Sequence, residues 1–285
     1  MAIARSGSAL RLAHLGPRGT YTEAAALAYA PDAQLQPLPS FTASVEAVER
    51  GEADAAVCAL ENSIEGAVLE TRDLLLREQS GVQICAEVVL PIRHALVGAA
   101  GLDLSRVAVV YSHPQALGQC RAQLAVLAPN ALPAAALSTA SAIEAAMAEP
   151  GTLAVGNELA AKLYGATIYA EDIADEPGNE TRFVVLARED APPTGDDKTS
   201  FAFTTHHDRP GSLVEVLALF SSRGLNLTRV ESRPTRHALG TYVFLVDVLG
   251  HRTDPLLAEA LTALQEAALW LRILGSYPRW TGSRA

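Results

Sequence analysis

Over the first 190 residues, short apolar runs alternate with longer alanine-rich stretches of mixed polarity. The runs have the length of buried strands, and the longer stretches have the length and periodicity of helices. Strands are predicted at 10–15, 53–60, 106–111, 152–155 and 181–187, with further extended segments within 81–97. Helices are predicted at 20–30, 66–78, 141–148 and 158–164, and one more helix ends near residue 127. This alternation favours an α/β fold with mainly parallel sheets.

A second unit follows residues 191–197, where two prolines, a glycine and two aspartates predict a linker. Beyond it, strands are predicted at 199–205, 226–233, 241–249 and 269–276, and helices at 212–223 and 254–268. The resulting βαββαβ order predicts a ferredoxin-like sandwich. The expected domains are therefore 8–190 and 198–278.

The composition narrows the class of protein. A chain of 285 residues with 49% hydrophobic content exceeds the usual size of one compact core and supports two domains. Its formal net charge of −10 argues against a nucleic-acid partner or an anionic membrane surface. No apolar run has membrane-spanning length, and the first residues lack the apolar core of a signal peptide. A cytoplasmic location is expected.

Cysteine use gives no support to a metal site. Cys58, Cys85 and Cys120 are odd in number and widely spaced, without a CxxC pair, as is typical of reduced cytosolic thiols. The sequence also lacks a GxGxxG after a strand and a GxxxxGK[ST] loop. These patterns give no support to a metal site or to the usual nucleotide-binding loops.

Four predicted helices begin after strands with a residue that carries a hydroxyl or an amide: Thr20, Asn62, Ser112 and Ser138. Each of these alone is an ordinary helix N-cap. In open α/β sheets, however, ligands lie at the carboxyl ends of strands, and exposed backbone N–H groups there suit carboxylates. The residues by themselves predict a protein that binds a small polyanion.

At these segments the chain resembles the prephenate dehydratase family, and its C-terminal unit resembles the regulatory ACT domain of that family. The resemblance runs in fixed order through seven segments, at 16–25, 61–66, 112–120, 138–142, 156–165, 179–183 and 211–234. Two small departures are Ala59-Leu60, where proline and isoleucine are common, and Tyr21-Thr22, which replaces a Phe-Ser pair. No chemical group of the motifs is missing.

The resemblance implies a catalytic domain of two α/β lobes, like a periplasmic binding protein, with the substrate in the cleft. The first lobe would take residues 10–87 and 175–188, and the second 88–174. It further implies a carbon–oxygen lyase that converts prephenate to phenylpyruvate in phenylalanine biosynthesis without a cofactor. Because no chorismate mutase unit is visible in the sequence, a monofunctional enzyme is expected.

The resemblance also implies the roles of individual residues. Thr181 would donate its hydroxyl toward the leaving oxygen, and Arg182 would neutralise a substrate carboxylate. Glu61 is a rival proton donor, and Arg182 has a structural ion pair as its alternative role. The remaining catalytic residues would be Asn62, Ser63, Ser112 and Gln119, and the substrate-binding residues Thr20, Ser138, Thr139 and Phe183.

In the ACT domain, the resemblance implies a site for phenylalanine as an allosteric inhibitor, formed between two subunits of a homodimer or homotetramer. Its residues would be Gly211, Ser212, Leu213, Asn226, Leu227, Glu231, Ser232 and Arg233. Two readings compete with a phenylalanine-inhibited prephenate dehydratase: an arogenate dehydratase, and a non-catalytic amino-acid sensor built on the same two modules.

Overall fold

The computed structural model describes residues 9–205, 210–234 and 242–282. The chain divides into two compact units. One contains residues 9–71 and 88–183, and the other contains residues 72–87 and 184–282. No helix within the described ranges is long and apolar enough to cross a membrane.

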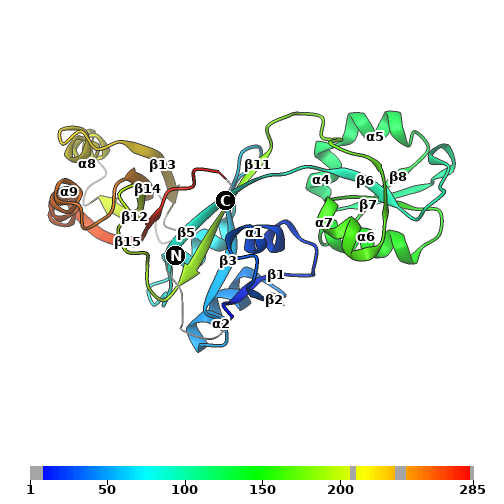
Figure 1. The fold of residues 1–285 in the computed structure, drawn as a ribbon. Coiled ribbons are helices and arrows are strands. Elements are labelled where there is room, and N and C mark those ends of the chain that lie inside the picture. The colour runs from blue at the N-terminus through cyan, green and yellow to red at the C-terminus, as the bar shows by residue number, and fades with distance from the viewer. Residues whose placement is uncertain (1–8, 206–209, 235–241, 283–285) are drawn as a thin grey trace. The chain divides into compact units, whose positions relative to one another are not determined.

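The secondary structure follows the alternation that the sequence predicts (Figure 1). The helices are α1 (Tyr21–Tyr29), α2 (Phe41–Arg50), α3 (Leu69–Leu76), α4 (Pro114–Gln119), α5 (Arg121–Leu127), α6 (Thr139–Ala148), α7 (Glu158–Tyr164), α8 (Ser212–Ser221) and α9 (Pro255–Ala267), with a short 3₁₀ helix at Leu104–Arg106. The first strands are β1 (Arg11–Leu15), β2 (Gln34–Leu38), β3 (Ala55–Asn62), β4 (Gly66–Ala67), β5 (Gln83–Pro91), β6 (Ala95–Gly98), β7 (Val109–Ser112) and β8 (Leu132–Ala135). The remaining strands are β9 (Leu153–Gly156), β10 (Thr167–Ala170), β11 (Glu180–Ala187), β12 (Asp197–Thr205), β13 (Leu227–Pro234), β14 (Tyr242–Leu249) and β15 (Ala268–Pro278).

The first sheet has the strand order β2-β1-β3-β11-β5, and β4 pairs with β3. Strand β1 runs parallel to both β2 and β3. The centres of β1 and β3 are fully buried, which is why both read as continuous apolar runs rather than as alternating ones. Parallel β1 and β3 bring their carboxyl ends to the same edge of the sheet, directly before two of the predicted helix starts.

The second sheet has the order β10-β6-β9-β7-β8 and is mixed. Strand β6 is antiparallel to β10 and β9, while β7 is parallel to β8 and β9, so β6 runs against the other four. Helices α4 to α7 surround this sheet (Figure 1). Side chains of β6 alternate between its two faces, with Ala95 and Val97 in one core and Leu96 in the other.

The predicted helix at 66–78 begins later than expected, at Leu69. Gly66 has a φ of +82° and pairs with Asn62 across the short β3–β4 hairpin, so the chain is still extended there. Asn62 caps a turn within this hairpin instead of a helix, because its side chain accepts the backbone N–H groups of Ile64 and Glu65.

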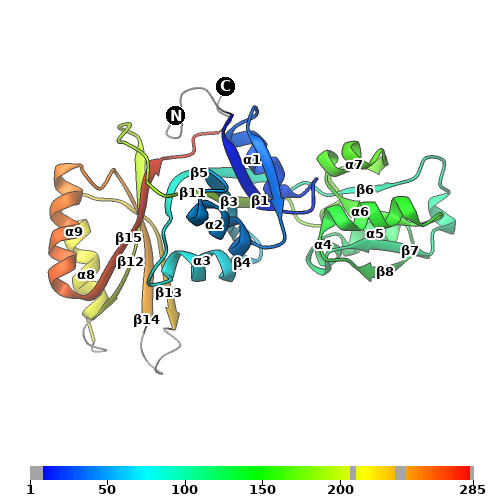
Figure 2. The same ribbon diagram turned by 90° about the horizontal axis from the view of Figure 1, so that it is seen from below.

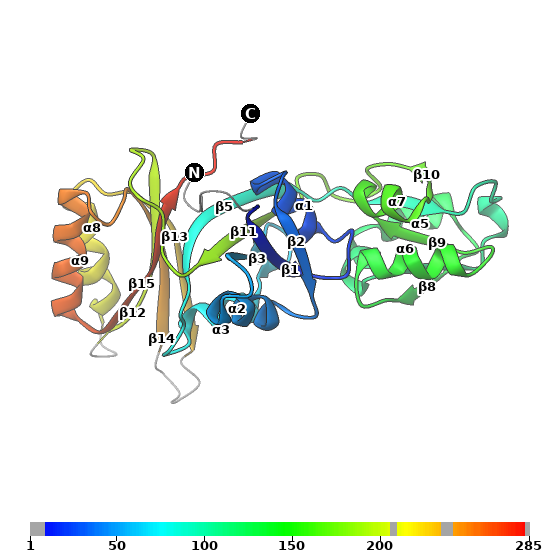
Figure 3. The same cartoon turned by 60° about the horizontal axis from the view of Figure 1, so that its bottom comes forward.

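The C-terminal residues form the predicted βαββαβ unit, which confirms the fold class. Its antiparallel sheet has the order β13-β14-β12-β15. Helices α8 and α9 lie side by side on one face of it (Figure 2), as the view in Figure 3 also shows. Phe201 and Phe203 of β12 are fully buried against Phe220 of α8 and Leu264 of α9.

Residues 72–87 group with the C-terminal unit through buried polar contacts. Glu87, 2% exposed, accepts hydrogen bonds from Nζ of Lys198 at 2.8 and 2.9 Å and from the backbone of Trp280 at 3.0 Å. The segment predicted as a linker is also anchored, since Ala191 is buried and its N–H donates to Ser276 O at 3.0 Å. The prolines and glycine of this segment predict a break between two units, but they do not predict that the segment packs against the C-terminal unit.

Candidate active site

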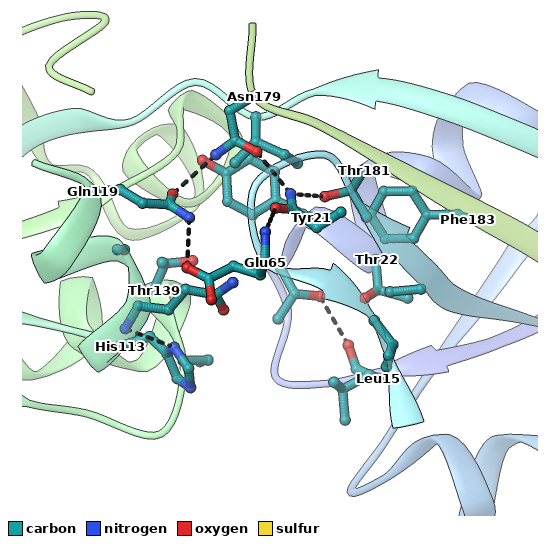
Figure 4. A pocket seen from close by; sticks show the side chains of 18 of the residues that line it. Leu15, Tyr21, Thr22, Glu65, His113, Gln119, Thr139, Asn179, Thr181 and Phe183 are labelled. Atoms are coloured by element: carbon teal, nitrogen blue, oxygen red, sulfur yellow. Dashed lines mark hydrogen bonds between the residues drawn. The ribbon is translucent and has the colours of Figure 1, made fainter. Parts of the chain in front are cut away.

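A cavity of about 690 Å³ lies in the unit formed by residues 9–71 and 88–183. This volume is within the range of small-molecule sites. Its wall includes the ends of β1 and β3, at Leu15 and Asn62, and the beginnings of α1 and α6. The residues around it lie on segments far apart in the sequence (Figure 4). The cavity is therefore at the strand ends and helix starts where the sequence predicts ligand binding.

Strand β11 presents Thr181 and Phe183 to the cavity. Both side chains are buried, at 7% and 2% exposure. Because side chains alternate along a strand, Arg182 lies on the other face, and it is not part of the cavity wall. The structure thus brings the threonine of this motif, but not its arginine, to the cavity.

The amide of Asn62 has one orientation, set by backbone donors. Its Oδ1 accepts the N–H groups of Ile64 and Glu65, both at 3.0 Å, so its nitrogen must face the other way. There Nδ2 donates to Oγ1 of Thr181 at 2.8 Å and to Oδ1 of Asn179 at 2.7 Å. The oxygen of Thr181 is therefore an acceptor in this contact, which leaves the hydroxyl proton to point elsewhere.

The hydrogen bonds continue from Asn179 across the cavity wall (Figure 4). Nδ2 of Asn179 donates to Oε1 of Gln119 at 2.9 Å, and Nε2 of Gln119 donates to Oε1 of Glu65 at 3.3 Å. Asn62, Asn179 and Gln119 thus form a continuous chain of amides that ends at a carboxylate on the cavity wall.

The beginnings of three helices, α1, α4 and α6, line the same cavity. Thr20 caps α1 by accepting the N–H of Glu23 at 3.3 Å and donating to Leu15 O at 2.8 Å. Ser138 caps α6 in a reciprocal box with Ser141, and Thr139 follows it in the wall. The described residues around the cavity include no lysine or arginine. Hydroxyl and amide donors and the positive ends of α1 and α6 are therefore the groups that can hold an anion here.

Two residues predicted for the site make other contacts. Ser63 donates to Gly178 O at 3.1 Å and accepts the N–H of Glu180 at 2.9 Å, which ties the start of β11 to the β3–β4 hairpin. Ser112 is fully buried and donates to Val155 O at 2.7 Å. Neither Ser63 nor Ser112 is in the cavity wall, and neither is the rival acid Glu61.

Seven further polar side chains in the wall were not among the predicted site residues: Tyr21, Thr22, Glu65, His94, His113, Gln115 and Asn179. Burial raises the pKa of Tyr21 and lowers the pKa of His94. Tyr21, His113 and Asn179 lie inside segments that the sequence analysis quoted, so their motifs could have identified them. His94 lies in an apolar extended segment without any motif.

No cluster of three or more potential metal ligands occurs among the residues that the structure describes. Cys58, Cys85 and Cys120 are buried and unbridged. Burial raises the pKa of Cys58, and that of Cys120 to about 12, so neither thiol is a thiolate at neutral pH.

The residues predicted for the effector site lie in the other unit. Gly211, with a φ of +92°, caps α8, whose first residues are Ser212 and Leu213. Asn226 and Leu227 lie at the beginning of β13, and Ser232 follows Glu231 along this strand. Glu231 is ion-paired with Arg72 of α3 and Arg229, and Arg233 with Asp73 of α3.

Comparison with known proteins agrees with this architecture. The family model described as prephenate dehydratase matches residues 12–191, and the ACT domain model matches residues 201–266. A prephenate dehydratase of Mycolicibacterium vanbaalenii is 39% identical over 284 residues, which cover 94% of this chain and 90% of that protein. A chloroplastic protein of Arabidopsis thaliana, named arogenate dehydratase/prephenate dehydratase 2, is 40% identical over 286 residues. The match covers 96% of this chain and 74% of that protein.

Among solved structures, the prephenate dehydratase of Arthrobacter aurescens in complex with L-Phe superposes with a TM-score of 0.86 at 40% identity. The match covers 95% of this chain and 90% of that one. The family model spans residues 12–191, the relatives have this identity and coverage, and a solved relative has the same fold. This chain therefore belongs to the prephenate dehydratase family and carries an ACT domain.

Proposed function

We propose that this chain catalyses the decarboxylative dehydration of prephenate to phenylpyruvate. The observation that carries the proposal is the hydroxyl of Thr181 at the cavity, with its oxygen held by Asn62. A hydroxyl held in this way can donate toward a leaving oxygen, which is the one polar event that the reaction requires at that end of the substrate.

In the proposed reaction, two bonds of the substrate ring break. The bond between the ring and its carboxylate breaks to release carbon dioxide, and its electron pair enters the ring. The carbon–oxygen bond at the opposite ring carbon breaks, and with one proton taken up the oxygen leaves as water. Aromatisation drives the step, so the enzyme supplies positioning and a hydrogen bond to the leaving oxygen. Thr181 donates that bond.

The substrate carries two carboxylates, and the proposal assigns them to the helix starts. Thr20 at α1 and Ser138 with Thr139 at α6 place these two helix N-termini in the cavity wall. The hydroxyls of Thr20 and Ser138 are engaged in capping, so the helix backbone is the main source of positive charge there. Each helix N-terminus stabilises a negative charge by about 0.3–1 kcal/mol at an exposed site and more when partly buried. Gln119 adds a neutral donor, and Phe183 gives the ring an apolar wall.

Substrate identity is tested by offering the purified chain prephenate and arogenate in parallel and measuring phenylpyruvate and phenylalanine. The proposal expects prephenate to give the higher kcat/KM. Arogenate is the second candidate because the Arabidopsis relative is named for both activities. A preference for arogenate would correct the substrate, and turnover of neither would favour a non-catalytic sensor.

We further propose that phenylalanine inhibits the enzyme through the ACT domain. Glu231 and Arg233 offer opposite charges along β13, as an amino acid's ammonium and carboxylate require, and Gly211 opens α8 in the same unit. The solved relative from Arthrobacter was crystallised with L-Phe. Calorimetry with the full chain is expected to show saturable binding of phenylalanine, and no heat of binding would remove the proposal.

The effector site is proposed to need two copies of the chain, which makes the enzyme a homodimer or homotetramer. Val214 and Leu269, exposed to 68% and 63% in one copy, are apolar side chains of the ACT unit that a second copy can cover. Sedimentation is expected to give two or four copies. A monomer at assay concentration would contradict this assembly.

A further inference from the structure

His94 is buried beside the cavity between two polar side chains. Its side chain is in the cavity wall although the residue is only 3% exposed. Nε2 lies 3.0 Å from Oε1 of Gln119, and Nδ1 lies 3.2 Å from the hydroxyl of Tyr21. The Tyr21 ring meets the imidazole edge to face, with 5.9 Å between centroids and 80° between planes. The imidazole is thus held on both of its nitrogens.

The direction of these hydrogen bonds follows from the backbone. Asn62 must donate to Asn179, because its own oxygen accepts two backbone N–H groups. Asn179 then has its oxygen occupied as an acceptor and donates its nitrogen to Oε1 of Gln119. Gln119 therefore turns its oxygen to both Asn179 and His94, and Nε2 of His94 must carry the proton that it donates.

The other nitrogen of the imidazole lies beside the hydroxyl of Tyr21. Tyr21 donates to Arg93 O at 2.6 Å, and the same hydroxyl lies beside Nδ1 of His94. Burial raises the pKa of Tyr21, so its hydroxyl keeps its proton. Burial lowers the pKa of His94, which favours the neutral ring. With hydrogen on Nε2, Nδ1 is an acceptor, and the single proton of the Tyr21 hydroxyl can go either to Nδ1 or to Arg93 O.

We propose that His94 is a positioning residue for the reaction, acting through Gln119. Its Nε2–H holds the oxygen of Gln119, so the NH₂ group of Gln119 is directed at the cavity, where Glu65 now accepts it. Without that donor the amide of Gln119 can rotate by half a turn. Its nitrogen would then face Asn179, which is itself a donor there, and the link to Asn62 and Thr181 would be broken. This inference rests on the proposed function.

A pair of variants separates positioning from mere packing. His94→Gln places an N–H near the position of Nε2, whereas His94→Asn reaches only the position of Nδ1. His94→Asn is expected to lower kcat about 10-fold or more with a smaller change in KM, and His94→Gln to stay within about threefold of the native kcat. Equal losses in the two variants, or a loss confined to KM, would overturn the proposal.

A double-mutant cycle tests whether His94 acts through Gln119. In a Gln119→Leu background, His94→Asn is expected to cause little further loss of kcat. Full additivity of the two losses would mean that His94 acts on its own and would contradict the proposal.

The tautomer can be measured without any turnover, which keeps this inference separate from the proposed function. In the native chain labelled with ¹⁵N-histidine, the His94 resonances are expected to show a neutral ring with hydrogen on Nε2 at pH 7. Hydrogen on Nδ1, or a charged ring at that pH, would overturn the assignment even if prephenate is turned over. Failure of the chain to use prephenate would count against the function and leave the tautomer test intact.

Discussion

The hydroxyl of Thr181 takes its orientation from Asn62, a side chain 119 residues earlier in the chain. Asn62 is in turn oriented by two backbone N–H groups of the turn that follows it. A threonine hydroxyl is a weak acid, so its use in the reaction depends on its direction more than on its pKa. The residue that directs it therefore matters as much as the hydroxyl itself.

Asn62→Asp tests this dependence with minimal change of shape. An aspartate keeps the oxygen that accepts the two backbone N–H groups but replaces the donor to Thr181 by an acceptor. The hydroxyl proton would then turn toward residue 62 and away from the substrate. We expect kcat to fall by about 10²-fold, the lower end of general acid–base contributions, in steady-state kinetics with prephenate. A kcat within threefold of the native value would show that the orientation of Thr181 is not set by Asn62.

His14 provides a prediction for pH. It is fully buried in β1, and burial lowers its pKa, with smaller opposing effects from Leu15 O and Glu23. The folded state therefore binds this proton less readily than the unfolded chain, whose histidine titrates near pH 6.5. The contribution of His14 to the free energy of unfolding is complete above that pH and is lost as the pH falls through the lower folded pKa.

The measurement compares the unfolding midpoints of the native chain and His14→Asn from pH 7 down to pH 5. The native chain is expected to be the more stable at pH 7, and the gap is expected to narrow as the pH falls. A gap that stays constant or widens toward pH 5 would contradict the lowered pKa of His14.

The motifs name single residues, but they do not show which of those residues line the cavity. Thr181, Asn62 and Gln119 line the cavity as the motifs suggested, whereas Arg182 and Ser112 do not. Side chains alternate along β11, so Arg182 lies on the face of the strand away from the cavity. The hydroxyl of Ser112 donates to the carbonyl of Val155 on the neighbouring strand β9. Neither effect could be derived from spacing without knowing which strands pair.

Helix α3 connects the two proposed sites at the scale of secondary structure. It begins at Leu69, directly after Val68 of the cavity wall, and carries Arg72 and Asp73. These two residues are paired with Glu231 and Arg233, which are proposed to bind the effector. In the proposed effector site, a ligand that competes for these charges would act on α3, and coupling of this kind is what allosteric inhibition requires.

Arg72→Gln tests this connection. In the proposed effector site, the ammonium group of phenylalanine competes with Arg72 for the carboxylate of Glu231. Removing Arg72 is therefore expected to lower the phenylalanine concentration for half-inhibition several-fold, while turnover without phenylalanine is unchanged. The measurement is the dose–response curve for phenylalanine of the native chain and of Arg72→Gln. An unchanged or higher half-inhibitory concentration in the variant would contradict a role for the Arg72–Glu231 ion pair.

Helices and strands were predicted well where apolar runs are continuous and missed where they are not. Strand β2 was missed because it is polar, contains Pro37 and lies at the edge of its sheet, where a proline is tolerated. Helix α2 follows it with Ser40 as its N-cap and Gly51, at a φ of +78°, as its C-cap. These end signals are present in the sequence, but the segment lacks the continuous apolar run that identifies the neighbouring strands.

For the whole molecule, the acidic charge and the proposed substrate have the same sign. A net charge of −10 cannot steer a dianion toward the cavity, so affinity must come from the local donors around it. From the composition, particular arginines and helix N-termini would be expected to hold such an anion. The described lining of the cavity includes the helix N-termini but no lysine or arginine. Composition alone does not predict which of the four predicted helix starts lie together at one cavity.

The most direct test of the account is phenylpyruvate formation from prephenate by the native chain and by Thr181→Ala, with Thr181→Ser as the matched control. The account predicts turnover by the native chain, a loss of kcat of about 10²-fold or more in Thr181→Ala with a much smaller change in KM, and substantial activity in Thr181→Ser. Normal turnover by Thr181→Ala together with an inactive Glu61→Gln would contradict it and transfer the role of proton donor to Glu61.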